Sequence, residues 1–181
     1  MSNDYKSVLV VGAGPVGLVA TASLISEGIP VKLIETTADL AQDLRASTFH
    51  PPTLDFLDKL GIADQLVEQG LICKNWQFRD RNSGVVASFD LSLLTGETKF
   101  PFRLQCEQWK LTKALRTYIE DHPDGELITR TSAEEVGQND DGVWVKTLDS
   151  NGEKRRYDGR FLIGSDGARS IVRKSIDAKF E

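Results

Sequence analysis

Cysteine and histidine are scarce in this sequence. The two cysteines, Cys73 and Cys106, have neither a CxxC nor a metal-ligand spacing, so we expect two small buried side chains, no disulfide and no metal site. The two histidines, His50 and His122, have no sequence neighbours that would form a catalytic dyad. No catalytic residue is therefore nominated from the sequence.

Long apolar runs and an excess of basic charge are also missing. The first six residues are polar, and no later run approaches the length of a membrane span. Acidic residues number 27 against 22 basic ones, and the net charge of -5 does not favour nucleic acid or anionic lipid. We expect a cytoplasmic protein with no nucleic-acid or membrane partner. At 181 residues, with 40% hydrophobic and 27% charged residues, the chain can bury a globular core.

The most informative stretch is a glycine-rich turn between an apolar run and a helical pattern, VLVVGAGPVG. Gly12 permits a tight turn, Gly14 lets the backbone approach a pyrophosphate, and Gly17 lets the next helix pack closely on the strand. Pro15 suits a first helical position, and with Val16 it opens a helix whose N-terminus offers N–H groups and a partial positive charge. The stretch therefore predicts a phosphate-binding turn.

A second short strand, expected over residues 31–35, completes a βαβ unit within about 30 residues. Glu35 ends this strand, 18 residues beyond Gly17. A carboxylate at this point can accept hydrogen bonds from both hydroxyls of an adenosine ribose, and it repels a 2′-phosphate. The predicted nucleotide is therefore FAD or NAD, and the alternative is a solvated glutamate at a strand end.

The rest of the chain departs from the strand and helix alternation of a plain NAD-binding domain. Two β-like runs separated by a hairpin signal lie between residues 76 and 91, and three more between residues 133 and 157 predict an antiparallel meander. The basic cluster at residues 154–156 is expected to be a solvated hairpin rim. A last apolar strand over residues 160–165 runs directly into Asp166 and a glycine.

Three separated stretches then agree: VGAGPVG with Glu35, LRAS with Arg45, and LIGSDGARSIVR with Asp166. Together they resemble the class A flavoprotein monooxygenases, the aromatic hydroxylases of the p-hydroxybenzoate hydroxylase and phenol hydroxylase type. The resemblance implies that the first stretch binds the ADP half of FAD. It also implies that Asp166, in the family's Asp-Gly motif, helps to hold FAD, while the motif as a whole is implicated in NAD(P)H contact.

The resemblance suggests three more cofactor-binding positions. Arg45 matches an arginine that touches the flavin, and Gln105 matches a glutamine that opens the helix after the sheet insertion. Val136 matches a position whose backbone lies near the adenine. The implied reaction is NAD(P)H reduction of the flavin, capture of O2 and hydroxylation of a small aromatic, usually phenolic, substrate, in which the protein supplies orientation and exclusion of water.

The resemblance implies an α/β fold: a Rossmann-like FAD-binding domain with a glutathione-reductase-type βαβ unit and a β-meander crossover, plus part of a second sheet. We expect residues 1–72 and 103–181 to form the FAD/NAD(P)-binding domain. Residues 73–102 are expected to be a β insertion that belongs to an incomplete substrate domain. Family members continue well beyond the Asp-Gly motif, so the chain is expected to be a truncated, N-terminal part.

Two consequences and two alternatives follow. Alone, the chain is expected to bind FAD weakly and not to hydroxylate, and its exposed apolar surface is expected to promote self-association. The first alternative is an NAD-linked or flavin oxidoreductase of another substrate class. The second is a non-catalytic binding protein that kept the fold, as the GDP-dissociation inhibitors do, or a truncated flavin- or nucleotide-binding fragment without turnover.

Overall fold

The computed structural model describes residues 7–40 and 46–179. It divides into two compact units, which are described separately: unit 1, Met1–Ala41 with Thr112–Glu181, and unit 2, Gln42–Leu111. The predicted β insertion, residues 73–102, lies inside unit 2, and its assignment to a substrate domain stays a prediction. No helix in the described part of the chain is both long and apolar enough to cross a membrane.

Unit 1 contains a four-stranded parallel sheet in the order β12-β1-β2-β8. Its strands are β1 (Val8–Val11), β2 (Val31–Ile34), β8 (Gly125–Ile128) and β12 (Phe161–Gly164). All four residues of β1 are buried, as expected for a strand in the middle of a parallel sheet. Because the strands are parallel, the carboxyl ends of β1, β2 and β12 meet at one edge, and the α/β fold is confirmed.

An antiparallel meander covers one face of this sheet. It consists of β9 (Thr131–Asn139), β10 (Gly142–Asp149) and β11 (Lys154–Gly159) in the order β11-β10-β9. Val136 and Val145 of the meander share a buried cluster with Leu9, Val11 and Ile34 of the sheet. The meander predicted from three punctuated runs is therefore present, and it closes the core of unit 1.

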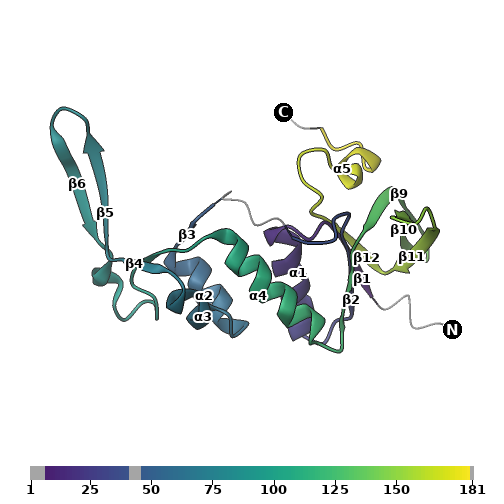
Figure 1. The fold of residues 1–181 in the computed structure, drawn as a ribbon, viewed down its shortest axis with the longest axis horizontal. Coiled ribbons are helices and arrows are strands. Elements are labelled where there is room, and N and C mark those ends of the chain that lie inside the picture. The colour runs from purple at the N-terminus through teal and green to yellow at the C-terminus, as the bar shows by residue number, and fades with distance from the viewer. Residues whose placement is uncertain (1–6, 41–45, 180–181) are drawn as a thin grey trace. The chain divides into compact units, whose positions relative to one another are not determined.

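The helices of unit 1 are α1 (Pro15–Ser26), most of α4 (Gln108–Glu120) and α5 (Ile171–Ser175). Helix α1 lies on the side of the sheet away from the meander (Figure 1). Its buried face includes Leu18 and Ile25, and α4 buries Leu115 and Ile119. These apolar residues recur at helical spacing, so burial of one face stabilises each helix.

Unit 2 contains a small antiparallel sheet in the order β3-β7-β4 and two helices. These elements are β3 (Thr48–Phe49), α2 (Pro51–Lys59), α3 (Ala63–Glu68), β4 (Leu71–Cys73) and β7 (Arg103–Gln105). The three strands were not predicted, because strands of two or three residues that pair between distant segments leave no periodic signal. Cys106 is buried as expected, whereas Cys73 is exposed and corrects that prediction.

A two-stranded hairpin, β5 (Asn75–Asp80) with β6 (Gly84–Asp90), extends unit 2 and is followed by a short 3-10 helix, η2 (Leu91–Leu94). The turn between β5 and β6 is held by the Asp80 carboxylate. It accepts hydrogen bonds from Ser83 N–H, Asn82 N–H and the Ser83 hydroxyl at 2.8, 2.8 and 2.9 Å. These bonds, led by that of Ser83 N–H, lower the pKa of Asp80 below its ordinary value.

Candidate functional site

The candidate site lies at the carboxyl edge of the parallel sheet in unit 1, where three chain segments are tied together. Gly12 N–H donates to Ile34 O at 2.8 Å, which joins the turn after β1 to the end of β2. Ser165 N–H donates to Val11 O at 2.8 Å, which joins the segment after β12 to the same turn. Motifs separated by more than a hundred residues in sequence are therefore neighbours in space.

The three glycines of the turn have different environments. Gly12 has φ +99°, and a Cβ on it would lie 2.5 Å from Ser165 O. A Cβ on Gly17 would lie only 1.9 Å from Gly12 O. A Cβ on Gly14 would meet nothing within 4 Å. Gly12 and Gly17 are thus required by packing, whereas Gly14 leaves open space in front of the turn, where a diphosphate can approach.

The N-terminus of α1 supplies donors beside this open space. Gly14 is the N-cap, no side chain caps the helix, and Pro15 occupies the first helical position. The first intrahelical bond to the cap is Leu18 N–H to Gly14 O at 3.0 Å. The first N–H groups of a helix have no intrahelical partner and carry a partial positive charge, so this end suits an anion. Val16 is 69% exposed at this end.

The Glu35 carboxylate is held in place beside the turn. Its Oε2 accepts the Ala13 N–H at 2.7 Å, and its Oε1 accepts the Thr37 N–H at 2.8 Å and the Thr37 hydroxyl at 2.9 Å. A carboxylate has about four lone-pair sites, so with three of them in use Glu35 retains about one for a ribose hydroxyl. Ala13 and Thr37 were not foreseen from the sequence, because nothing in their residue types indicates a bond to a distant carboxylate.

Asp166 organises the segment that follows β12. Its Oδ1 accepts the Ser170 hydroxyl at 2.5 Å, and its Oδ2 accepts the Ile171 N–H at 2.7 Å and, more weakly, the Val172 N–H at 3.4 Å. Ser170 in turn accepts the Arg173 N–H at 2.9 Å as the N-cap of α5. The Asp166 side chain therefore stabilises the start of α5, and its contact with FAD stays a prediction.

The other three predicted cofactor residues are Arg45, Gln105 and Val136. Arg45 lies outside the described residues. Gln105 belongs to unit 2, where it is exposed, donates to Ser47 Oγ at 2.7 Å and accepts from Thr48 Oγ1 at 3.2 Å. Val136 is buried in unit 1 and pairs with Val145 in the meander. Their roles toward a cofactor stay predictions.

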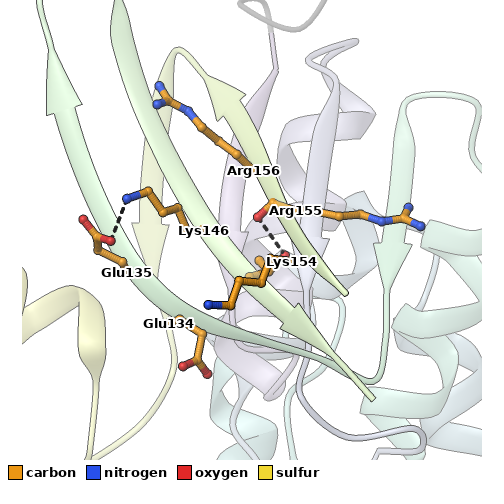
Figure 2. Close-up of a pocket in the computed structure, with 7 residues that line it drawn as sticks. Glu134, Glu135, Lys146, Lys154, Arg155 and Arg156 are labelled. Atoms are coloured by element: carbon orange, nitrogen blue, oxygen red, sulfur yellow. Dashed lines mark hydrogen bonds and ion pairs between the residues drawn. The ribbon is translucent and has the colours of Figure 1, made fainter. Parts of the chain in front are cut away.

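The basic cluster of the meander forms a shallow hollow of about 330 Å³ that does not resemble a second nucleotide site. Figure 2 shows Lys146 directed at Glu135, and the two form an ion pair at 2.8 Å. Arg155 pairs with Glu153 at 3.0 Å, and Arg156 pairs with Asp158 at 2.7 Å. These side chains are exposed and mostly neutralised, as predicted for a solvated hairpin rim.

A parallel βαβ unit, a glycine turn, a carboxylate at the end of the second strand and a meander over the sheet define a dinucleotide-binding α/β domain. More specifically, the chain belongs to the FAD binding domain family, which matches residues 5–181. FAD is therefore the cofactor of this domain. This result settles the choice between FAD and NAD that Glu35 left open.

The chain is similar to proteins whose names describe aromatic monooxygenases. It is 32% identical to para-nitrophenol 4-monooxygenase of Pseudomonas sp. (strain WBC-3), covering 96% of this chain and 43% of that protein. It is 27% identical to pentachlorophenol 4-monooxygenase of Sphingobium chlorophenolicum, covering 97% of this chain and 32% of that protein.

The chain is also similar to solved structures of a monooxygenase and a hydroxylase. Superposition on p-nitrophenol 4-monooxygenase PnpA from Pseudomonas putida DLL-E4 has a TM-score of 0.88 at 30% identity, and covers 95% of this chain and 43% of that one. Aklavinone-11 hydroxylase, solved with FAD and aklavinone, has a TM-score of 0.82 at 28% identity, with 98% and 36% covered. The chain thus spans less than half of the length of these relatives.

Proposed function

We propose that this chain is the FAD-binding part of an FAD-dependent monooxygenase that hydroxylates a small aromatic, phenolic substrate with NAD(P)H and O2. The observation that carries the proposal is the union of the phosphate turn, Glu35 and the segment before Asp166 at one sheet edge. Two of the similar proteins described above are named for phenolic substrates, which supports the substrate class.

In this proposal each part of the site has a separate task. The open space at Gly14 and the N–H groups of Val16 and Gly17, which follow Pro15 at the start of α1, receive the diphosphate. Glu35 accepts an adenosine ribose hydroxyl. FAD, when bound, supplies the redox chemistry, while Asp166 orders the segment that closes the turn.

The hairpin of unit 2 supports the proposed substrate domain over residues 73–102. Trp76, Phe78 and Phe89 form an aromatic cluster on it, with ring centroids 5.2 to 6.1 Å apart, yet each is at least 40% exposed. An isolated two-stranded hairpin is marginally stable in water and needs further strands or a packing partner. We infer that this hairpin is one part of a larger sheet in a full-length monooxygenase.

The cofactor proposal is tested by titrating the purified chain with FAD and following the flavin spectrum and fluorescence. Glu35→Ala is expected to weaken FAD binding at least tenfold, because a charge-assisted hydrogen bond to the ribose, which contributes about 1.5–3 kcal/mol, is lost. Glu27→Ala is the matched control, since Glu27 is an exposed glutamate at the other end of α1. Equal affinity of the two variants would remove Glu35 from the site.

The activity proposal is tested by following NADH and NADPH oxidation with a phenol and O2, with product analysis. For the isolated 181-residue chain we expect FAD binding without hydroxylation, because the chain covers less than half of the length of its similar proteins. A hydroxylated product from this chain would contradict that expectation. A colourless protein that takes up no FAD would instead favour a non-catalytic fragment.

We also infer that the isolated chain self-associates through an apolar face of unit 1. Among the described residues β12 pairs only with β1, so its other edge is free. A groove of about 510 Å³ runs beside it, where Phe161 and Ile176 are 62% and 68% exposed. Sedimentation at several concentrations tests this inference, and Phe161→Ser with Ile176→Ser should restore a monomer. A concentration-independent monomer of the unmodified chain would refute it.

A cytoplasmic location stays a prediction.

A further inference from the structure

The phosphate turn is held from behind by a serine that follows β12. The Ser165 hydroxyl lies 2.8 Å from Val11 O and 2.8 Å from Gly12 O. Val11 O also accepts the Ser165 N–H, but among the described residues Gly12 O accepts no other hydrogen bond. The Ser165 hydroxyl is therefore the hydrogen-bond donor to Gly12 O, the carbonyl at the point where β1 turns toward α1.

This contact lies in the most crowded part of the site. A Cβ on Gly17 would lie 1.9 Å from Gly12 O and 2.4 Å from the Ser165 Oγ, so these three groups are packed together. A Cβ on Gly14, by contrast, would meet nothing within 4 Å. The Ser165 hydroxyl thus contacts the carbonyl oxygens of Val11 and Gly12 in the packed part of the turn, whereas the proposed position of the diphosphate is the open space at Gly14.

We propose that Ser165 is a positioning residue of the FAD site, whose hydroxyl holds the turn in the shape that receives the diphosphate. A peptide unit has its carbonyl and N–H on opposite sides, so fixing the Gly12 carbonyl toward Ser165 directs the following N–H away from it. That N–H belongs to Ala13 and donates to Glu35 Oε2. Ser165 therefore orients both the turn and the ribose-binding carboxylate. The proposal rests on FAD binding as the function of this site.

The test compares Ser165→Ala with Ser23→Ala. Ser23 is the matched control because its hydroxyl also donates to a backbone carbonyl at 2.8 Å, that of Val19, within α1 and away from the turn. FAD and ADP, which share the diphosphate, are titrated at a temperature well below the melting temperature of every variant. Ser165→Ala is expected to raise both dissociation constants about five- to tenfold, the effect of one neutral hydrogen bond, and Ser23→Ala is expected to leave them unchanged.

Amide hydrogen exchange in the absence of ligand provides a second readout. In Ser165→Ala the peptide covering residues 12–17 should exchange faster, while peptides of α4 and the meander should exchange as in the unmodified chain. A role of Ser165 in global stability alone would instead raise exchange throughout unit 1 and leave FAD affinity unchanged below the melting temperature.

The outcomes separate this proposal from the proposed function. If Ser165→Ala matches the control in affinity and in exchange, Ser165 is not a positioning residue. If the unmodified chain binds neither FAD nor ADP, the FAD proposal fails. In that case unchanged exchange at residues 12–17 in Ser165→Ala overturns the present proposal as well, and faster exchange there retains the ordering role of Ser165.

Discussion

A single added methyl group is expected to have different effects at two glycines of the turn: at Gly17 it should lower stability, and at Gly14 it should weaken FAD binding without lowering stability. In Gly17→Ala the new Cβ lies 1.9 Å from Gly12 O and 2.4 Å from the Ser165 hydroxyl oxygen, so the backbone must move. Overpacking lowers the free energy of unfolding by about 1–3 kcal/mol. Because the contact here is with a backbone atom, the loss should be at the upper end, about 3 kcal/mol. Replacing glycine by alanine in a helix returns about 1 kcal/mol. The net loss of about 2 kcal/mol should lower the melting temperature by about 4–8 °C and weaken FAD binding.

Gly14→Ala is the matched comparison. Gly14 has φ -68° and ψ 175°, an extended conformation that alanine adopts, and a Cβ would meet no atom within 4 Å. The unligated variant should therefore melt within about 2 °C of the unmodified chain, since surface changes of this kind stay within about 0.5 kcal/mol. FAD affinity should nevertheless fall, because the methyl group occupies the proposed path of the diphosphate.

The assays are thermal unfolding by circular dichroism without ligand and FAD titration by fluorescence. Loss of stability should be confined to Gly17→Ala, and loss of FAD affinity should be shared by both variants. If Gly17→Ala melts and binds FAD like the unmodified chain, Gly17 is not required by packing; if Gly14→Ala binds FAD with full affinity, the diphosphate does not approach the turn at Gly14.

Three further predictions concern side chains around this site and in unit 2. Thr37→Val removes the hydroxyl that donates to Glu35, and FAD titration should show a two- to fivefold weaker affinity, about the contribution of one hydrogen bond at the low end. Iodoacetamide at pH 8, followed by peptide mass spectrometry, should label exposed Cys73 before Cys106, because burial raises the pKa of the Cys106 thiol; faster labelling of Cys106 would contradict its burial. Hydrogen bonds in the hairpin turn lower the pKa of Asp80 below its ordinary 3.8, so its support for the turn is complete above that pH and is lost as the pH falls through the folded-state pKa. Nuclear magnetic resonance of the turn amides between pH 5 and 2 should show the hairpin loosening over this range, and Asp80→Asn should remove the dependence.

The βαβ unit and the meander could be predicted because their signals are local. A buried apolar run followed by glycines, and β-like runs separated by turn residues, indicate elements that form over a few neighbouring residues. The strands β3, β4 and β7 were not predictable in this way. Each has two or three residues and exists because distant segments pair in unit 2.

In the candidate site, too, some features follow from local sequence and others depend on contacts between distant segments. The residue types at Gly12, Gly14, Gly17 and Glu35 are sufficient for the sequence alone to predict a nucleotide-binding turn with a ribose-binding acid, since the chemistry requires those side chains at that spacing. Only the tertiary structure decided that, besides Gly12 O at 1.9 Å, the Ser165 hydroxyl also closes the space at Gly17, 2.4 Å from a Cβ there although it lies 148 positions away along the chain. Contacts of this kind depend on the parallel alignment of β1 and β12, and spacing along a sequence carries no record of which strands lie side by side.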